Sequence, residues 1–245
     1  MPLITRQTAV GPTVTGVFGA SDLSPRTRRV ASAAIHRAWR WIGEVGATSP
    51  DDAGSRRFGA VGPGSLIAFP PGDVFGEARV AIGADTLVAP YVSLAVGMPG
   101  EPMDDETPVI VIGDRCLIGR GTSIIARCRV EIGDDVTVAP NVYITDHNHS
   151  YGNVEMPIGR QWPAADAVRI GDGSWLGSGV IVLPGASIGC HVTVAAGAIV
   201  RGAVPDFSVI AGVPARVVRR YTPEAGWLPP MRDLVLEPPE GWPVH

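Results

Sequence analysis

Aliphatic residues return every six positions along most of this chain, from Ile82 to Val204. A small or β-branched residue follows each of them four positions later, as Thr86 follows Ile82. An amphipathic helix would repeat its apolar residues about every 3.6 positions, and a half-buried strand would alternate them. A period of six fits neither, and instead predicts a solenoid of short strands separated by corners.

A second period groups these hexads into coils. The residue after the aliphatic position is Gly or Ala in the first two hexads of a group but larger in the third, as at Ile125, Leu183 and Arg201. Three hexads therefore make one turn of a triangular prism with aliphatic residues in its core. At the Gly and Ala positions, either a large side chain is disfavoured or the backbone adopts unusual dihedral angles. We expect five recognisable coils, preceded by a degenerate coil around residues 66–80.

Two segments interrupt the repeat, residues 96–109 and 146–169. Each follows a third hexad, so both are expected to leave the same edge of the prism, two coils apart. Loops that leave one edge can build a common site. A smaller irregularity at Arg129 to Glu131 lengthens one coil by two residues and is interpreted as a bulged corner.

One amphipathic helix is expected over about residues 24–45. Ser24 and Pro25 suit its N-cap and first helical positions. Apolar residues then return at helical spacing: Val30, Ala34, Ala38, Trp41 and Val45. We expect this stripe to cover an open end of the prism or to pack on a neighbouring subunit. The cluster of arginines on the same segment is interpreted as a solvated helix face.

The chain is accordingly divided into three parts. Residues 1–64 form an N-terminal segment with the helix, residues 65–220 form the repeat domain, and residues 221–245 form a Pro-rich, extended tail. A chain of 245 residues leaves no room for a second catalytic domain beside these parts.

Composition limits the classes of function. All 20 basic residues are Arg, which excludes Schiff-base chemistry on a lysine amine. The net charge of −4 argues against nucleic acid as the main partner. No apolar run approaches the roughly 20 residues of a membrane helix, and no secretory signal opens the sequence, so we expect a cytoplasmic protein. The three cysteines suggest no disulfide framework, and Cys116 and Cys128 are interpreted as inward packing residues.

With this repeat, residues 66–220 resemble the left-handed β-helix acyltransferases. This hexapeptide-repeat family includes galactoside, maltose and other polysaccharide or xenobiotic O-acetyltransferases. The left-handed winding is implied by the resemblance, because ordinary parallel crossovers are right-handed. The expected fold class is therefore an all-β solenoid, a left-handed parallel β-helix with an N-terminal α-helix and an extended C-terminal tail. The resemblance also implies a homotrimer with sites between subunits, and residues 205–216 resemble the family's terminal coil and exit loop.

Two histidines, His147 and His149, open the second interruption. A histidine of near-neutral pKa can take the proton of an alcohol as that oxygen attacks a thioester. In the resembling family the catalytic histidine lies just after the third hexad of a middle coil, which is His147 here. His149 is the rival, because an alternating extended chain points both side chains to the same side. The remaining alternative is a pair of loop histidines satisfied by backbone groups.

The charged residues near the two histidines give no strong indication of a role in catalysis. Asp146 and Glu155 could orient the imidazole, but an adjacent aspartate on an extended chain points away, so both are interpreted as solvated loop charges. The two histidines could also be zinc ligands, as in the trimeric carbonic anhydrases that share the prism. A further histidine at the spacing of those enzymes is absent from the sequence, and we expect no metal.

The donor site is expected on the later coils. Ser178 and Ala196 are 18 residues apart and so occupy the same position on successive coils. Small residues there leave backbone groups accessible to an extended ligand. The resemblance implies that these two positions contact the pantetheine arm of coenzyme A, that Trp175 lies near the coenzyme, and that Arg216 and Arg219 face its phosphates. The alternatives are surface packing for Trp175 and solvated charge for the arginines, although an always-charged, planar guanidinium suits phosphate.

These expectations amount to an acetyl-CoA-dependent O-acetyltransferase that acts on a hydroxyl of a sugar or other small molecule. The alternatives are a non-catalytic β-helix scaffold and a carbonic-anhydrase-like enzyme. The sequence departs from the galactoside and maltose enzymes at Gly121-Thr122-Ser123, where those enzymes carry an acceptor-binding Asn. The acceptor is therefore expected to be defined by the loops 96–109 and 146–169.

Overall fold

The structure is a computed structural model that describes residues 24–98 and 107–230. The chain divides into two compact units, residues 1–45 and residues 46–245. Helix α1 (Pro25–Gly46) belongs almost entirely to the first unit and lies where the sequence predicts a helix. Ser24 caps it, since its Oγ accepts the Thr27 N–H at 3.2 Å. No helix of the described residues is long and apolar enough to cross a membrane.

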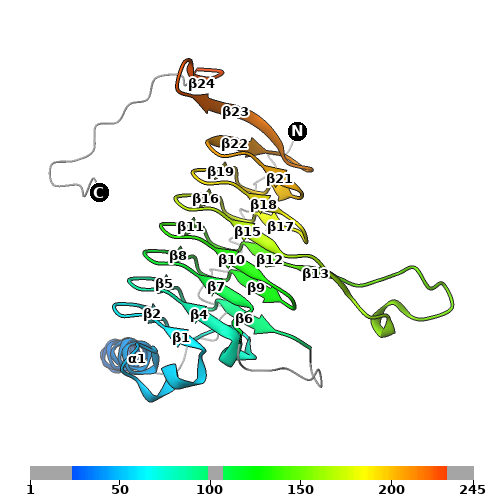
Figure 1. The fold of residues 1–245 in the computed structure, drawn as a ribbon. Coiled ribbons are helices and arrows are strands. Elements are labelled where there is room, and N and C mark those ends of the chain that lie inside the picture. Colours follow the sequence, from blue (N-terminus) through cyan, green and yellow to red (C-terminus); the bar gives the residue numbers. More distant parts are fainter. Residues whose placement is uncertain (1–23, 99–106, 231–245) are drawn as a thin grey trace, which may run out of the picture. The chain divides into compact units, whose positions relative to one another are not determined.

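The second unit is built from three parallel sheets that the chain enters in turn (Figure 1). The first sheet contains β1 (Ala60–Val61), β4 (Val80–Ile82), β7 (Ile110–Ile112), β10 (Val130–Ile132), β15 (Val168–Ile170), β18 (Ser187–Ile188) and β21 (Ala203–Val204). The second contains β2 (Leu66–Ile67), β5 (Leu87–Val88), β8 (Leu117–Ile118), β11 (Thr137–Val138), β16 (Trp175–Leu176), β19 (Thr193–Val194) and β22 (Ser208–Ala211). The third contains β3 (Val74–Phe75), β6 (Ser93–Val96), β9 (Ser123–Ala126), β12 (Tyr143–Thr145), β17 (Ile181–Val182) and β20 (Ile199–Val200).

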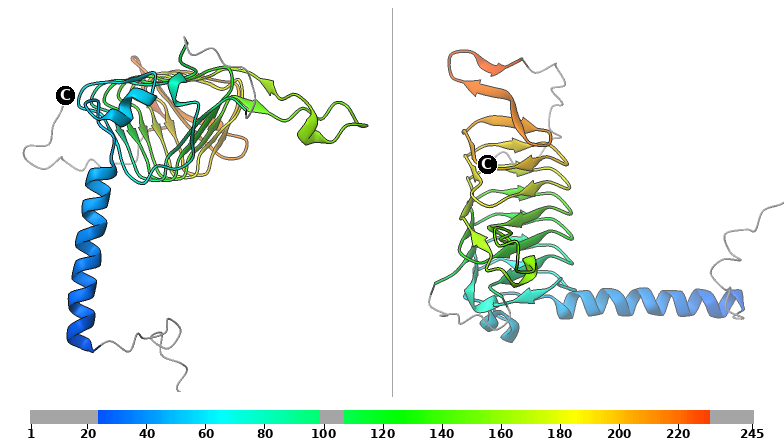
Figure 2. Two further views of the ribbon diagram at one scale, coloured as in Figure 1. Left: turned by 90° about the horizontal axis from the view of Figure 1, so that it is seen from below. Right: turned by 90° about the vertical axis from the view of Figure 1, so that its right-hand side faces the viewer.

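Each strand pairs in register with its counterpart on the next coil, as Ile82 does with Ile112. Seen from below, the coils therefore lie over one another (Figure 2). The degenerate coil is confirmed, because β2 and β3 pair in parallel with β5 and β6. Its first strand, β1, pairs with β4, so this coil begins before the expected boundary at residue 65. Short 3₁₀ helices, η2 (Ala53–Arg57) and η3 (Glu77–Arg79), complete this end.

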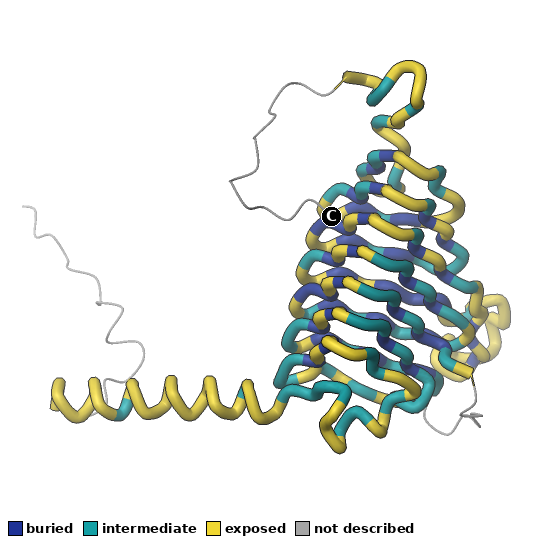
Figure 3. Tube along the Cα trace, turned by 60° about the vertical axis from the view of Figure 1, so that its left-hand side comes forward, coloured by how far each residue is buried: buried dark blue, intermediate teal, exposed yellow. Residues whose placement is uncertain are grey.

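The aliphatic positions of the repeat form the core. Ile82, Val88 and Leu94, one from each sheet of a coil, are at most 2% exposed, and the same positions are buried on the later coils except at Val204, which is partly buried (Figure 3). Burying one such side chain stabilises a fold by about 1.5–3 kcal/mol. Cys116 is buried as expected, but the prediction for Cys128 is wrong, because that residue is exposed.

Of the two explanations offered for the Gly and Ala corner positions, close stacking holds, whereas unusual dihedral angles do not occur at these positions. A Cβ on Gly83 would lie 2.7 Å from the Gly113 carbonyl carbon on the next coil, so close stacking excludes a side chain there. Positive φ angles occur two residues further on, for example 53° at Asp85 and 56° at Asp135. Asp and Gly are among the residues that tolerate this left-handed region best.

An aspartate ladder follows the corner between the first and second sheets. Asp114 Oδ1 accepts the Ala84 N–H at 2.7 Å, and Asp134 Oδ1 accepts the Asp114 N–H at 2.9 Å. Asp172 repeats the arrangement with Asp134 at 2.9 Å. Each carboxylate thus satisfies a corner amide of the preceding coil, which fixes the stacking of successive coils.

The expected common edge of the two interruptions is confirmed. They follow β6 and β12, which both pair with β9 in the third sheet. Residues 99–106 of the first interruption lie outside the described residues. The second contains β13 (His147–Asn148), η4 (Ile158–Arg160) and β14 (Ala164–Ala165) and extends away from the coils (Figure 1). The bulge prediction at 129–131 is misplaced, because β10 pairs regularly from Val130, and the extra residues fall within 127–129.

The expected extended tail is wrong for its first part. The strand β23 (Arg216–Thr222) pairs antiparallel with β22, and β24 (Gly226–Leu228) pairs with β23. Aromatic rings hold this hairpin, since the Tyr221 ring lies 6.2 Å from the Phe207 ring and 5.7 Å from the Trp227 ring between centroids. The hairpin closes the second sheet at its last coil. Residues 231–245 lie outside the described residues.

Candidate active site

A buried carboxylate lies next to His147 at the root of the second loop. Asp146 Oδ1 is 2.9 Å from His147 Nδ1, and Asp146 is 0% exposed. The expectation that Asp146 is a solvated loop charge is therefore wrong. Glu155 is exposed, as expected.

The two extra residues of the preceding coil explain why Asp146 turns inward. The Arg127 N–H lies 2.9 Å from both carboxylate oxygens. The N–H groups of Cys128 and Arg129 each lie 2.7 Å from Oδ2. Three successive amides thus converge on one carboxylate, an arrangement that favours an anion. The irregularity in the sequence is the binding site of the Asp146 side chain.

This network fixes the tautomer of His147. The three backbone groups that contact the Asp146 carboxylate are all N–H donors, so the carboxylate is placed as a hydrogen-bond acceptor. His147 Nδ1 must therefore carry the hydrogen that it shares with Asp146. In the neutral imidazole Nε2 then keeps its lone pair and can take a proton. The His147 side chain is 20% exposed, so part of the imidazole faces solvent.

Both ends of the loop are held against the coils. The strand β13 pairs antiparallel with β14, with His147 opposite Ala165. The Asp166 N–H donates to the Asp146 carbonyl at 2.7 Å. The Arg127 guanidinium stacks over the Trp162 ring at 3.9 Å and donates to the Pro163 carbonyl at 3.0 Å. These contacts give His147 a fixed backbone, as a group that transfers protons needs.

His149 lies in a different environment. It is exposed and follows the end of β13. No group within residues 24–98 and 107–230 hydrogen-bonds to its ring. The geometry therefore favours His147 over His149 as a proton acceptor.

The residues expected at the donor site lie along the corner between the second and third sheets. Ser178 and Ala196 occupy successive coils, and the Gly197 N–H donates to the Ser178 carbonyl at 2.9 Å. Both residues are exposed, and their N–H groups have no acceptor in the described part of the chain. A Cβ on the neighbouring Gly179 or Gly197 would meet no atom within 4 Å. This corner, which we call the donor-site corner, is an exposed strip of backbone on which the N–H groups of Ser178 and Ala196 are available for hydrogen bonds.

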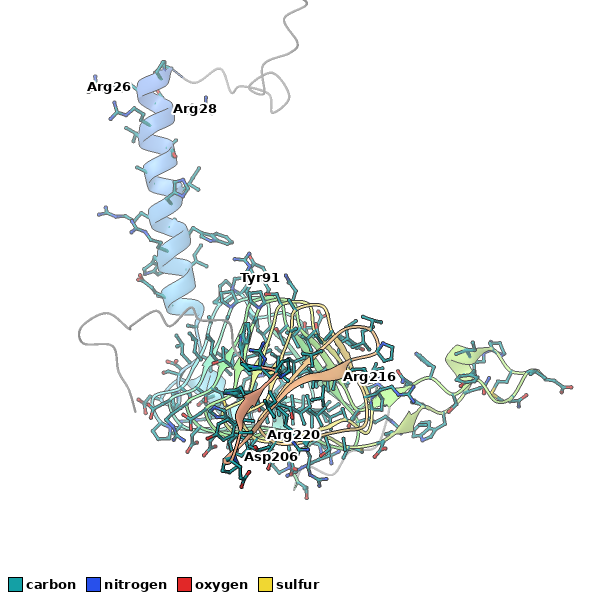
Figure 4. The ribbon with its side chains drawn as sticks, turned by 90° about the horizontal axis from the view of Figure 1, so that it is seen from above. Arg26, Arg28, Tyr91, Asp206, Arg216 and Arg220 are labelled. Carbon is teal, nitrogen blue, oxygen red and sulfur yellow. The ribbon has the colours of Figure 1, made fainter. Side chains whose placement is uncertain are left out.

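Trp175 and the two arginines lie on the same side of the prism. Trp175 is 48% exposed on β16, paired with Thr193 on β19. On β23, Arg216 lies opposite Ala211, and Arg219 lies opposite Val209. A bulge between these pairs places both arginines on the outer face, because directly opposed residues share a face. Figure 4 shows Arg216 and Arg220 towards opposite ends of β23.

Within one chain, His147 and the residues of the donor-site corner lie apart. His147 follows the end of β12 in the third sheet, whereas Ser178 precedes the start of β17, the neighbouring strand. They therefore lie beyond opposite ends of the strands of that sheet. Among the described residues, no group of three or more His, Cys, Asp or Glu side chains could hold a metal ion.

Comparisons with known proteins agree with the repeat. The family model for the hexapeptide repeat of succinyl-transferase matches residues 109–146 and 167–201. These ranges cover the coils on both sides of the second loop. They include the segment that directly precedes His147 and the donor-site corner.

Curated relatives are named acetyltransferases. The chain is 34% identical over 110 residues to galactoside O-acetyltransferase of Escherichia coli K12, covering 45% of this chain and 53% of that protein. It is 38% identical over 123 residues to WbbJ of the same organism, a protein assigned to lipopolysaccharide biosynthesis as an O-acetyl transferase, covering 47% and 63%. It is 32% identical over 122 residues to serine acetyltransferase of Mycobacterium tuberculosis, covering 50% and 48%. The chain thus spans less than two thirds of each of these relatives.

Solved structures share the fold. AntD, an N-acyltransferase from Bacillus cereus in complex with dTDP and 3-hydroxybutyryl-CoA, superposes with a TM-score of 0.57 at 16% identity, covering 72% of this chain and 90% of that one. At this identity the likeness concerns the fold alone. It supports a prism of hexapeptide repeats for the second unit.

Proposed function

Because its repeats place this chain in the hexapeptide-repeat acyltransferase family, we propose that it transfers an acetyl group from acetyl-CoA to a hydroxyl group of a small-molecule acceptor. The observation that carries the proposal is the Asp146–His147 pair at the loop root. A scaffold needs neither a buried carboxylate nor a fixed imidazole beside it. The left-handed winding of the coils remains part of this proposal.

His147 is the general base of the proposed reaction. Nε2 takes the proton of the acceptor hydroxyl while the oxygen bonds to the thioester carbonyl carbon. The carbon–sulfur bond then breaks, and the proton passes from Nε2 to the leaving thiolate of coenzyme A. Asp146 holds the ring in one tautomer and stabilises the positive charge that develops on it, as the aspartate of a Ser-His-Asp triad does. Backbone N–H groups stabilise the oxyanion.

The donor-site corner suits the pantetheine arm of coenzyme A. That arm is an extended chain with amide groups, and the free N–H groups of Ser178 and Ala196 offer it hydrogen bonds. The absence of bulky side chains around them leaves room for close approach. Trp175, Arg216 and Arg219 share the outer surface of the second sheet, where the guanidinium groups can bind the phosphates.

A homotrimer completes the site. His147 and the donor-site corner lie beyond opposite ends of the strands of the third sheet. One chain therefore supplies the base, and a neighbouring chain supplies the donor-site corner. This arrangement gives three sites between subunits. Loop 146–169 then contributes to the acceptor side of each site, and a sugar hydroxyl is the first candidate for the acceptor.

Release of free coenzyme A tests this proposal. With acetyl-CoA and a panel of glycosides, nucleotide sugars and small alcohols, the wild-type protein is expected to release thiol only when an acceptor is present. His147→Ala is expected to lower the rate by about 10²- to 10⁴-fold without changing the oligomeric state. His149→Ala is the matched control and should leave the rate near that of the wild type. Equal rates for His147→Ala and the wild type would contradict the proposed role.

A further inference from the structure

Helix α1 presents an apolar face over about half of its circumference, counted at about 100° per residue from Arg29 to Val45. That arc contains Val30, Ala31, Ala34, Ile35, Ala38, Trp39, Trp41, Ile42 and Val45. No residue of α1 is buried, so the structure does not confirm the expected cover for this stripe (Figure 3). Ile35 and Val45 are 66% and 65% exposed. This large an apolar surface indicates a binding partner.

The rest of the circumference is basic. Four of the five arginines, Arg26, Arg29, Arg37 and Arg40, lie there with one acidic residue, Glu44, whereas Arg28 lies near the Trp39 border of the apolar arc. No ion pair within the described residues engages any of the five. Figure 4 shows Arg26 and Arg28 on opposite sides of the first turn. The helix therefore offers guanidinium groups to an anionic partner.

The distribution of residues distinguishes between kinds of partner. A helix that packs against another helix has a narrow seam of apolar residues, whereas this arc covers half of the helix. Trp39 lies at one border of the arc, and Trp41 lies next to Val30 at the other. Tryptophan is enriched where an apolar phase meets water, and arginines beside it keep their charged groups in the water.

We propose that α1 lies in the surface of a bilayer of anionic phospholipid. Its apolar arc enters the boundary between head groups and acyl chains, and its arginines bind lipid phosphates through paired N–H donors. A helix of this kind lies along the surface, because charge runs the full length of one face. The second unit is thereby held at a membrane, whatever reaction it performs.

Vesicle flotation with the full-length protein tests this inference. We expect binding to vesicles of phosphatidylcholine mixed with phosphatidylglycerol, weak binding to phosphatidylcholine alone, and release as salt is added. This comparison needs no variant. Equal binding to both vesicle types, or no binding to the anionic vesicles, would overturn the proposal.

Two adjacent substitutions form a matched pair. Ile35→Asp and His36→Asp add the same charge, but the first lies on the apolar arc and the second on the basic face. Ile35→Asp is expected to weaken partitioning into anionic vesicles by about a hundredfold, and His36→Asp by no more than about fivefold. Circular dichroism and thermal unfolding verify that both variants keep the fold of the second unit.

The same variants distinguish the competing partners. If Ile35→Asp instead lowers the oligomeric state in sedimentation, with no effect on vesicle binding, the arc is an interface between copies and the proposal is wrong. If single-stranded RNA displaces the wild-type protein from anionic vesicles, and binds Ile35→Asp as well as the wild type, the arginines serve nucleic acid and the proposal is equally wrong.

Discussion

Asp146 Oδ1 lies 2.9 Å from Nδ1 of His147, and the carboxylate that makes this contact is fully buried. Two residues adjacent in sequence thus form an acid–imidazole pair, which an extended backbone would not allow. The pair exists because the chain turns from β12 into the loop at Asp146, while three amides of the preceding coil bind its side chain. The proposed reaction depends on this relationship more than on any other.

Asp146→Asn keeps the size of the side chain but changes its hydrogen bonding. The side-chain amide of Asn has a single acceptor oxygen, so it cannot accept all the hydrogen bonds that the two carboxylate oxygens now accept. The imidazole therefore loses its fixed tautomer. We expect kcat for coenzyme A release to fall by about 10²-fold or more, while binding of acetyl-CoA is unchanged. Glu155→Gln, which removes an exposed carboxylate of the same loop, is the control and should have no effect. A normal kcat in Asp146→Asn would show that the pair is structural.

Cys128 reports on the same carboxylate. Partial burial of the thiol, and then the charge of Asp146, raise the pKa of Cys128 to about 11, although the residue as a whole is exposed. In a Cys190→Ser protein, where only Cys128 is accessible, reaction with a thiol-specific disulfide reagent should accelerate about tenfold per pH unit up to that pKa. Adding Asp146→Asn should accelerate the reaction at pH 8. A rate that levels off near pH 9 would be inconsistent with this environment.

Glu131 links two arginines across neighbouring coils. Its Oε1 accepts from Arg129 Nε at 2.8 Å, and its Oε2 accepts from Arg169 Nε at 2.9 Å. The hydrogen bond from Arg129, more than that from Arg169, lowers the pKa of Glu131. Because the folded-state pKa is the lower one, the stabilisation is present above the unfolded pKa and is lost as the pH falls through the folded pKa.

Urea unfolding of Glu131→Gln measures this contribution. The wild type should exceed the variant by up to about 1 kcal/mol in free energy of unfolding at pH 7, since the pair is partly exposed. The difference should shrink below about pH 4.3, where the unfolded carboxyl group becomes protonated. Glu155→Gln, which removes an exposed carboxylate without an ion pair in the described residues, serves as the control. A difference that grows on acidification would contradict the assigned direction.

The donor-site corner is tested by filling it. Ala196→Trp places a large side chain on the open strip beside Ser178, so we expect acetyl-CoA affinity to fall by at least about tenfold. Ser187→Trp, at an exposed position of the first sheet, controls for the effect of an added tryptophan on the fold. Unchanged affinity in Ala196→Trp would place the coenzyme elsewhere.

The period of six made the sheets predictable because it reports backbone geometry directly. Ile82 and Ile112 pair in neighbouring strands although the first loop lies between them, since the repeat resumes in phase after that loop. The positions of Ser178 and Ala196 followed from the same counting. Such inferences depend only on spacing and therefore survive interruptions of the repeat.

Side-chain direction at irregular positions was not predictable in this way. Asp146 was expected to point away from His147, because alternation was extended beyond the end of β12. The available signal was the spacing of eight residues between Ile124 and Ile132, which marks the amides that bind Asp146. Likewise, no repeat in the sequence predicts the hairpin of β23 and β24. Arg216 and Arg219 share one face only because of the bulge in this hairpin.

Calorimetric titration of acetyl-CoA into the wild-type protein tests the central claim most directly, because it requires no knowledge of the acceptor. We predict saturable binding with a dissociation constant below about 1 mM, in the usual range for enzyme substrates, and one site per chain. His147→Ala should bind equally well, since the base is needed for transfer and not for the donor. No heat of binding at millimolar acetyl-CoA would contradict the assignment of this protein as an acetyl-CoA-dependent transferase.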